Sequence, residues 1–331
     1  MQPLVSIIIP TYNSEKFIFK ALDSIKQQCF QAYEVIIVDA GSDDKTKDIC
    51  ELYDERFIFL ELKGSKQGEA RNLGVSNANG ELVMFLDSDD IFSDDHVLTD
   101  SIQKVSEIDA DFYNFAVSFV KEKVVMKNIL FPKEFHADSR DEILSLGLYG
   151  KSIHTIPWNK IYKRKFLTDN DIIFPKLKEQ EDMVFVIHCC MKANKVIFVN
   201  RIIVNAEIRN DSLSRTMSSI NIQCCLDVFQ SIERLLKSEG ILEMFKEEFN
   251  CYKMRTSAYT LLMTTFRVRS DDDFWKGVRI IKKSGSLEPW LSISMLKAIK
   301  VTTAISIMIA KFSLLLRIFR LFRNLKLIKG Y

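Results

Sequence analysis

The segment LVSIIIPTYN, residues 4–13, decides how the chain folds. Its first six residues are apolar except for one serine, and Pro10 closes the run. Apolar residues at helical spacing follow, with Phe17, Ala21 and Ile25 four positions apart. A strand this continuously apolar is buried on both faces, as the strands of parallel sheets are. The segment therefore predicts a buried strand followed by a helix, the first unit of an α/β domain.

The same alternation of strand and helix returns through the first half of the chain. Further apolar runs predict strands at residues 35–38, 57–60 and 82–86, with helices at about 43–53 and 69–78 between them. This pattern is typical of a doubly wound, mostly parallel sheet. Long helical patterns replace it from about residue 221. We expect an α/β catalytic domain over residues 1–215 and a helical region over residues 216–331.

Composition excludes several classes of protein. Of 331 residues, 47% are apolar and 27% are charged, so the chain is neither disordered nor collagen-like. The net charge of +2 is too small for a protein that neutralises many phosphates over its surface, and we expect no nucleic-acid partner. The seven cysteines form no C-x-x-C motif and predict reduced core thiols. The first residues lack the basic n-region of a signal peptide, and we therefore expect the protein in the cytoplasm.

Charge is concentrated in the last segment, residues 291–331, which holds eight basic residues and no acidic one. Arg317, Arg320 and Asn324 share one helical face, and apolar residues occupy the other. We expect this basic amphipathic helix to bind the inner face of the membrane peripherally. The alternative is a helix packed on the α/β domain with a solvated basic face. Its most apolar run, residues 301–310, is too short to span a bilayer.

Polar residues gather where three of the predicted strands end. They are PTYN at 10–13, DAGSDD at 39–44 and DSDD at 87–90. Ligands of open α/β sheets lie beyond the carboxyl ends of the strands, so the three tips predict one binding site. A single tip of this kind would be explained equally well by the capping and turn preferences of Asp, Ser, Asn and Gly.

The sharpest signal is Asp87 with Asp89 after a buried strand. Carboxylates crowded on one turn repel one another unless a cation lies between them. Mg²⁺ or Mn²⁺, bound by carboxylates and by the phosphates of a substrate, would relieve this repulsion. The chain has neither a Walker A motif nor G-x-G-x-x-G, so a P-loop NTPase and a dinucleotide-binding dehydrogenase lose support.

Four motifs, VSIIIPTYN, VDAGSDD, EARNLG and FLDSDD, resemble in order those of the inverting family 2 glycosyltransferases, which have the GT-A fold. The resemblance implies a nucleotide-diphosphate sugar across the strand tips and Mn²⁺ or Mg²⁺ held by Asp89, with Asp87 reaching the ribose or the metal. Asp39 and Arg71 would line the nucleotide pocket. Many members carry a second acidic residue, which can contact the base, at the position where this chain has Ala40. Despite this departure, uridine is the base that we expect. The donor-binding residues implied are Pro10, Tyr12, Asn13, Asp39, Arg71, Asp87, Ser88, Asp89, Arg209 and Ser212.

Two later segments, PWNKIYK at 157–163 and EQEDMVF at 179–185, also resemble the family. The resemblance makes Asp182 the general base and Glu181 an orienting or acceptor-binding neighbour. Acidic residues at a helix start can instead merely complement the helix dipole. The segment RNDSLS at 209–214 resembles the part that closes over the diphosphate. The acceptor would contact Asp90, Trp158 and Lys160. Plain packing of its ring would explain Trp158 equally well.

Together these features predict a metal-dependent, inverting glycosyltransferase of surface polysaccharide biosynthesis. It would move a sugar, from UDP in the first instance, to a saccharide or a polyprenyl-linked saccharide. A catalytically inactive nucleotide-sugar-binding or scaffold protein of the same fold is the alternative. Nucleotidyl transfer, a second enzyme class, typically uses a Gly-rich, basic N-terminal loop that this chain lacks.

Overall fold

The computed structural model describes residues 2–150, 152–209, 219–268 and 270–287. The chain divides into two compact units. The first comprises residues 1–144, 155–176 and 181–209, and the second comprises residues 145–154, 177–180 and 210–331. The domain border predicted at residue 215 and the basic segment 291–331 lie outside the described residues.

A single large sheet forms the centre of the first unit. Its strands are β1 (Val5–Thr11), β2 (Tyr33–Asp39), β3 (Phe57–Glu61), β4 (Leu82–Phe85), β5 (Ile91–Phe92), β6 (Phe112–Lys121), β7 (Val124–Ile129), β8 (Phe135–Ala137), β9 (Lys160–Lys163) and β10 (Val196–Glu207). The main path runs in the order β3-β2-β1-β4-β9-β6-β10-β5. β1 to β4 are parallel, as predicted, and β6 is parallel to β10. β9 runs antiparallel between β4 and β6.

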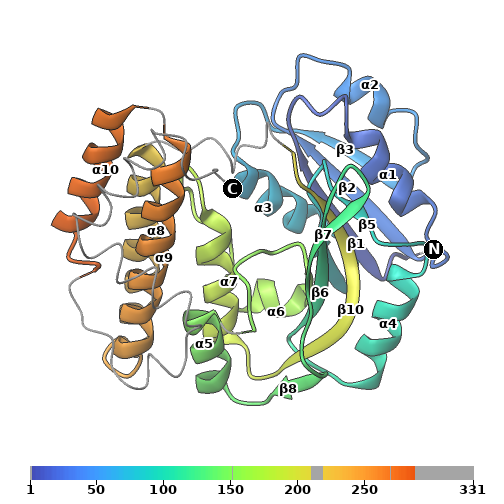
Figure 1. The fold of residues 1–331 in the computed structure, drawn as a ribbon. Coiled ribbons are helices and arrows are strands. Elements are labelled where there is room, and N and C mark those ends of the chain that lie inside the picture. The colour runs from blue at the N-terminus through green and yellow to red at the C-terminus, as the bar shows by residue number, and fades with distance from the viewer. Residues whose placement is uncertain (1, 151, 210–218, 269, 288–331) are drawn as a thin grey trace. The chain divides into compact units, whose positions relative to one another are not determined.

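Helices cover both faces of this sheet. They are α1 (Ile18–Lys26), α2 (Thr46–Cys50), α3 (Gln67–Asn77), α4 (Val97–Glu107), α6 (Arg164–Asp169) and α7 (Glu181–Lys192), while α5 (Arg140–Tyr149) has residues in both units. Figure 1 shows α1, α2 and α4 on one side and α3, α6 and α7 on the other. The predicted helix at 43–53 is shorter than expected, because the turn before it is held by hydrogen bonds to Asp39 and Asp44 side chains.

The register aligns the ends of the parallel strands. Thr11 at the end of β1 pairs with Asp39 at the end of β2, and Ile8 pairs with Phe85 at the end of β4. The chain leaves β4 directly into the turn that carries Asp87. The three polar segments predicted from the sequence therefore follow neighbouring strands at one edge of the sheet.

An aromatic cluster fixes α7 against β4. The ring of Phe85 lies 5.3 Å from that of Phe174 and 5.7 Å from that of Phe185, and Phe174 and Phe185 stack at 3.8 Å. All three are buried, and burying one such side chain contributes about 1.5–3 kcal/mol. On the same face, a Cβ at Gly74 of α3 would lie 2.3 Å from Ile8 Cγ2, so α3 rests directly on β1. These contacts hold α3 and α7 in place on the sheet, and both helices carry residues of the site described below.

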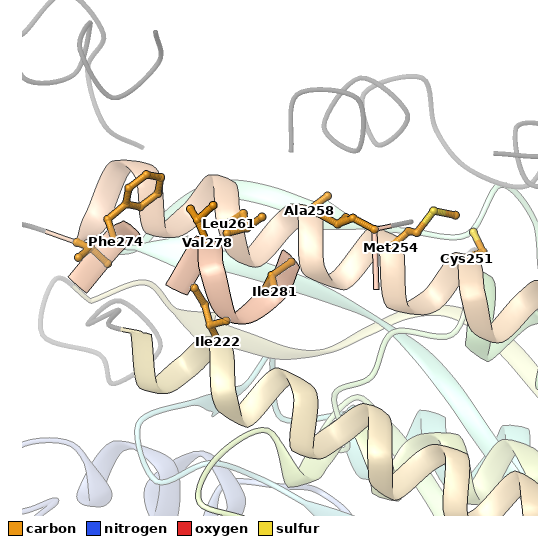
Figure 2. Close-up of a cluster of buried hydrophobic side chains, with 10 residues drawn as sticks. Ile222, Cys251, Met254, Ala258, Leu261, Phe274, Val278 and Ile281 are labelled. Atoms are coloured by element: carbon orange, nitrogen blue, oxygen red, sulfur yellow. The ribbon is translucent and has the colours of Figure 1, made fainter. Parts of the chain in front are cut away.

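The described part of the second unit is helical, with α8 (Ser219–Ser238), α9 (Lys246–Arg267) and α10 (Asp271–Lys283). One face of α9 presents Cys251, Met254, Ala258 and Leu261 to a buried apolar cluster. Figure 2 shows them with residues of α8 and α10, namely Ile222, Phe274, Val278 and Ile281. This core of facing apolar stripes accounts for the helical pattern in the sequence.

None of the helices among the described residues is both long and apolar enough to cross a membrane.

Candidate active site

The ends of β1 and β2 are joined through Asn13. Its backbone N–H donates to Ser42 Oγ at 2.8 Å, and its Oδ1 accepts from the backbone N–H of Asp43 at 3.0 Å. Asn13 has a φ of 46°, a left-handed conformation that asparagine adopts more readily than most residues. Tyr12 beside it is 61% exposed, whereas Pro10 is buried within β1. The side chain of Tyr12 is thus accessible to a ligand at this edge of the sheet.

Asp39 organises the turn after β2. Its Oδ2 accepts from the backbone N–H groups of Gly41 and Ser42 at 3.0 and 2.7 Å, and its Oδ1 accepts from Ser42 Oγ at 2.5 Å. Gly41 has a φ of 94°, which a residue with a Cβ adopts rarely. The carboxylate of Asp39 is almost completely buried. It shapes the loop, and its contact with a nucleotide stays a prediction.

The turn after β4 brings three carboxylates together. One oxygen from each of Asp87, Asp89 and Asp90 lies within 4.8 Å of the other two. Burial and the neighbouring Asp87 raise the pKa of Asp89, although Arg209 opposes this. Burial, Asp87 and Asp89 raise the pKa of Asp90 well above its usual range. Oxygen donors that repel one another in this way suit a hard divalent cation, so the residues fit Mn²⁺ or Mg²⁺.

Within this turn the side chains differ in what they can reach. Asp90 is buried, and its Oδ1 accepts from the backbone N–H of Glu207 at 3.0 Å, which ties the turn to β10. Ser88 lies 2.9 Å from Ser14, oxygen to oxygen, and so links the turn to the start of the α1 region. Asp87 and Asp89 keep about a quarter of their side chains exposed. They are the carboxylates with the easier access to a bound ion.

Arg71 connects the acidic turn to the start of α7. Its guanidinium is fully buried, and it lies 5.3 Å from the ring centre of Phe174. Nη2 donates to Asp87 Oδ1 at 2.8 Å, and Nη1 donates to Asp182 Oδ1 at 2.6 Å. A buried guanidinium needs such partners, because an unpaired charge in the interior costs several kcal/mol. The side chain of Arg71 therefore binds carboxylates from two of the predicted motifs.

Glu181 and Asp182 form the first turn of α7, as predicted. Glu181 is buried, and its Oε1 lies 3.5 Å from Arg71 Nη1. Asp182 keeps 26% of its side chain exposed. Burial raises the pKa of Asp182 from 3.8 to about 7; Arg71 opposes this shift, and Glu181 and Asp87 add to it. A carboxyl group with a pKa close to neutral can take a proton from a substrate hydroxyl.

Arg209 closes the other side of the acidic turn. Its Nη2 pairs with Asp89 Oδ2, and its guanidinium carbon lies 4.0 Å from the ring centre of Phe17. The planar guanidinium is suited to carboxylate or phosphate oxygens. Ser212 and Ser214 lie outside the described residues.

Known proteins are similar to this chain in sequence and in fold. The family described as Glycosyl transferase family 2 matches residues 6–170, about half of the chain. EpsH of Bacillus subtilis is 26% identical over 266 residues, which cover 78% of this chain and 77% of EpsH. The chain belongs to glycosyltransferase family 2. It is accordingly an enzyme of the glycosyltransferase class.

A second relative matches over a shorter part. The poly(ribitol-phosphate) beta-N-acetylglucosaminyltransferase TarS of Staphylococcus aureus is 33% identical over 198 residues, which cover 58% of this chain and 33% of TarS. The chain thus spans about a third of the length of that relative.

Solved structures share the GT-A fold. The crystal structure of S. aureus TarS 1–349 in complex with UDP-GlcNAc has a TM-score of 0.67 at 21% identity and covers 98% of this chain and 91% of that one. The mannosyltransferase PcManGT from Pyrobaculum calidifontis, in complex with GDP-Man and Mn²⁺, has a TM-score of 0.53 at 16% identity and covers 94% and 86%.

In this family 2 chain, all three residues predicted to bind the acceptor, Asp90, Trp158 and Lys160, are buried. Trp158 is 7% exposed, and its ring packs edge-on against Phe119 at 6.2 Å. Lys160 is fully buried in β9, where Nζ donates to the carbonyl of Ile156 and to Asn159 Oδ1, both at 2.7 Å. Burial lowers the pKa of Lys160 to about 7. Direct contact with an acceptor would require these side chains to be uncovered, and that role stays a prediction.

Sequence reasoning missed two residues that position the family 2 site. Asn72 Nδ2 donates to the carbonyl of Phe174 at 2.8 Å, and its Oδ1 accepts from the N–H of Phe174 at 2.9 Å. This reciprocal pair ties α3 to the segment that leads into α7. The ring of Phe17 lies against the guanidinium of Arg209, and the sequence indicates this residue only as part of an apolar helix pattern. The adjacency of Asn72 to Arg71 was the available signal, but no spacing in the sequence indicates a partner 102 residues away.

Proposed function

We propose that the protein transfers a sugar from a nucleoside-diphosphate donor to a hydroxyl group of an acceptor, with inversion at the anomeric carbon. The observation that carries the proposal is the position of Arg71, which binds Asp87 of the acidic turn and Asp182 of α7 at once. A donor held at the acidic turn and an acceptor hydroxyl near Asp182 would then meet in one place. Similarity to TarS, whose structure contains UDP-GlcNAc, supports a UDP-sugar as the first donor to test.

The divalent ion would be held by Asp87 and Asp89. When bound, Mn²⁺ or Mg²⁺ would supply positive charge to the departing diphosphate. The Mn²⁺ in the PcManGT complex supports the choice of ion. Arg209 would exchange its partner Asp89 for phosphate oxygens as the donor arrives, since a guanidinium pairs equally with either anion.

Asp182 would act as the general base. It takes the proton of the acceptor hydroxyl while that oxygen forms a bond to C1 of the sugar. The bond between C1 and the diphosphate oxygen breaks, and its electron pair leaves with the nucleoside diphosphate. Arg71 keeps the carboxylate of Asp182 in place and stabilises its charged form. A single displacement of this kind inverts the configuration at C1.

The acceptor we propose is a saccharide or a polyprenyl-linked saccharide of a cell-surface polymer. The name of TarS, a poly(ribitol-phosphate) sugar transferase, supports a surface polymer. The eight basic residues from 291 onward support attachment to the inner face of the membrane. Removing residues 291–331 should then release the protein from anionic vesicles and leave donor binding intact. Vesicle binding that survives the truncation would show that residues 291–331 are not the attachment.

The test of the proposal is release of the nucleoside diphosphate. Purified protein with Mn²⁺ is offered UDP-sugars and GDP-mannose, and binding is followed by thermal shift; a donor at 100 times its Kd stabilises by about 2.7 kcal/mol. Acceptor-dependent release of UDP or GDP identifies sugar transfer. The alternative, a binding or scaffold protein of this fold, predicts a thermal shift with no release under any acceptor.

A further inference from the structure

A second cluster of metal-ligating side chains lies outside the acidic turn. It consists of Cys29, Asp95 and His96, all exposed, and one ligand atom from each lies within 4.8 Å of the other two. Cys29 follows α1, and Asp95 and His96 precede α4. None of the three belongs to the candidate active site. Of the seven cysteines, Cys29 is the exposed one and the other six are buried, which makes its sulfur the accessible thiol.

The separations suit a tetrahedral transition-metal site. Bonds of about 2.0–2.3 Å from zinc to sulfur, nitrogen and oxygen place neighbouring ligand atoms roughly 3.5 Å apart. His96 Nε2 and Asp95 Oδ1 are 3.6 Å apart. The sulfur of Cys29 lies within 4.8 Å of a ligand atom of each of the other two residues, and its side chain is exposed. It would complete a set of three protein ligands, with water as the fourth, as in other sites with three protein ligands.

The backbone that carries these ligands is held in place by other contacts. The N–H of Cys29 donates to the carbonyl of Asp95 at 2.9 Å. Gln28, which is buried, donates to the carbonyl of Asp94 at 2.6 Å and accepts from the N–H of Leu98 at 2.9 Å. The two segments are thus fixed side by side by hydrogen bonds that use none of the three ligating groups.

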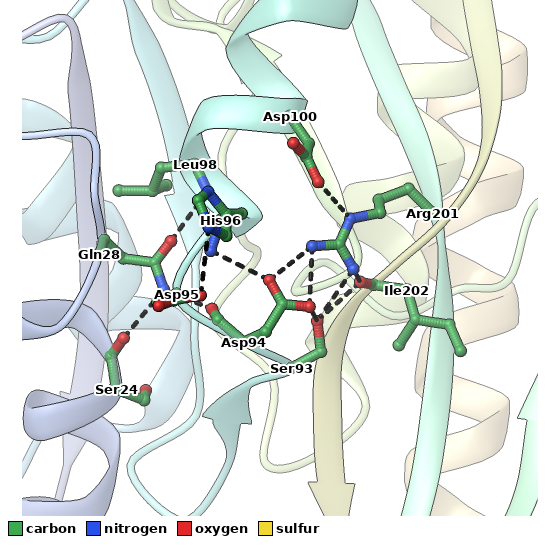
Figure 3. Close-up of polar contacts among 10 residues, drawn as sticks. All are labelled: Ser24, Gln28, Ser93, Asp94, Asp95, His96, Leu98, Asp100, Arg201 and Ile202. Carbon is green, nitrogen blue, oxygen red and sulfur yellow. Dashed lines mark hydrogen bonds and ion pairs between the residues drawn. The ribbon is translucent and has the colours of Figure 1, made fainter.

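Asp94 is held separately and is not a ligand. Arg201 donates to both of its oxygens, at 2.6 and 2.8 Å, and the N–H of His96 donates to Oδ1 at 3.0 Å. Figure 3 shows Gln28 on one side of this turn and Arg201 on the other. These contacts fix the backbone that carries Asp95 and His96.

We propose that Cys29, Asp95 and His96 bind a divalent transition-metal ion, Zn²⁺ foremost, which links the segment after α1 to the start of α4. The donor set decides the class of ion. Thiolate and imidazole favour Zn²⁺ and its neighbours, whereas Mg²⁺ and Mn²⁺ prefer oxygen. The site therefore selects a different metal from the acidic turn.

Titration of the full chain, without an affinity tag, with Co²⁺ tests the proposal. A thiolate ligand gives a charge-transfer band in the near ultraviolet, which the acidic turn cannot give because it offers oxygen only. We expect one equivalent of Co²⁺ to produce the band and Zn²⁺ to abolish it, since Zn²⁺ binds such sites more tightly. Zn²⁺, but not Mg²⁺, should also slow the reaction of Cys29 with a thiol reagent.

Three variants locate the ion. Cys29→Ser should lose the band, and His96→Gln and Asp95→Asn should weaken Co²⁺ binding by at least about tenfold. His136→Gln is the matched control, because His136 also pairs with an aspartate, Asp138, on the surface. Its metal binding should equal that of the parent. A band that persists in Cys29→Ser, or no band at all, would overturn the proposal and leave a surface ion pair beside an unrelated thiol. None of these readouts depends on sugar transfer.

Discussion

Arg71 and Asp182 are joined by a hydrogen bond of 2.6 Å although 111 residues separate them in the chain. The same guanidinium holds Asp87 at 2.8 Å. The acidic turn and the start of α7 are therefore connected through one buried guanidinium. A shift of Asp87 would therefore act on Asp182 through the side chain of Arg71.

Replacing Asp182 with asparagine separates binding from turnover. Asp182→Asn keeps the size of the side chain and can still accept from Arg71, but it cannot take a proton. We expect sugar transfer to fall by ~10²–10⁴ with little change in donor affinity. Parallel measurements of kcat and of donor Kd check this. Near-normal transfer would rule out Asp182 and make Glu181 the next base to test.

Replacing Arg71 with lysine tests whether its contacts with both Asp87 and Asp182 matter. Arg71→Lys keeps one positive charge, but a single ammonium cannot donate to Asp87 and Asp182 in the two directions that the guanidinium spans. We expect both transfer and stability to fall, because breaking a buried ion pair costs about 3–5 kcal/mol. Chemical denaturation measures the stability. Lys47→Arg is a control, because Lys47 pairs with Glu51 on the surface, and its effect should be near zero. Unchanged kinetics in Arg71→Lys would show that transfer does not depend on one side chain binding both Asp87 and Asp182.

Removing Asp89 tests the metal. Asp89→Ala deletes an accessible carboxylate of the acidic turn and also releases Arg209. We expect donor binding to lose its dependence on Mn²⁺, because the protein supplies few other oxygens to the ion. Calorimetry with UDP-sugar, with Mn²⁺ or with EDTA, is the measurement. If the variant binds donor as the parent does and EDTA affects neither, the ion does not lie at Asp89.

Gly74 is expected to be intolerant of any side chain. A Cβ there would lie 2.3 Å from Ile8 Cγ2, well inside contact distance. Gly74→Ala should therefore lower the free energy of unfolding by about 1–3 kcal/mol, since α3 must move off β1. Gly64→Ala is the comparison, with open space around it but a φ of 72°. A Gly74→Ala protein as stable as the parent would mean that α3 can shift without cost.

The sequence predicted the parallel strands and the grouping of their tips, because both depend on local patterns of apolar and polar residues. It could not place β9, since KIYK at 160–163 is short and its antiparallel position between β4 and β6 depends on distant partners. The burial of Lys160 follows from that position. The link between Arg71 and Asp182 was also out of reach, because it is made by tertiary packing around Phe174 and not by spacing along the chain.

The pH dependence of transfer follows from the environment of Asp182. Burial raises the pKa of this carboxyl from 3.8 to about 7, and a general base acts only when it has lost its proton. The rate constant kcat/KM should therefore level off above about pH 7 and fall about tenfold for each pH unit below it. An ordinary aspartate would place this limb near pH 4. Activity should fall toward acid pH and not toward alkaline pH, because acid protonates the base and so removes activity.

A pH profile measured at saturating Mn²⁺ checks the midpoint, and the same profile for Asp182→Asn shows whether Asp182 is the group that titrates. If the residual activity of that variant keeps a limb near pH 7, the titrating group is another one.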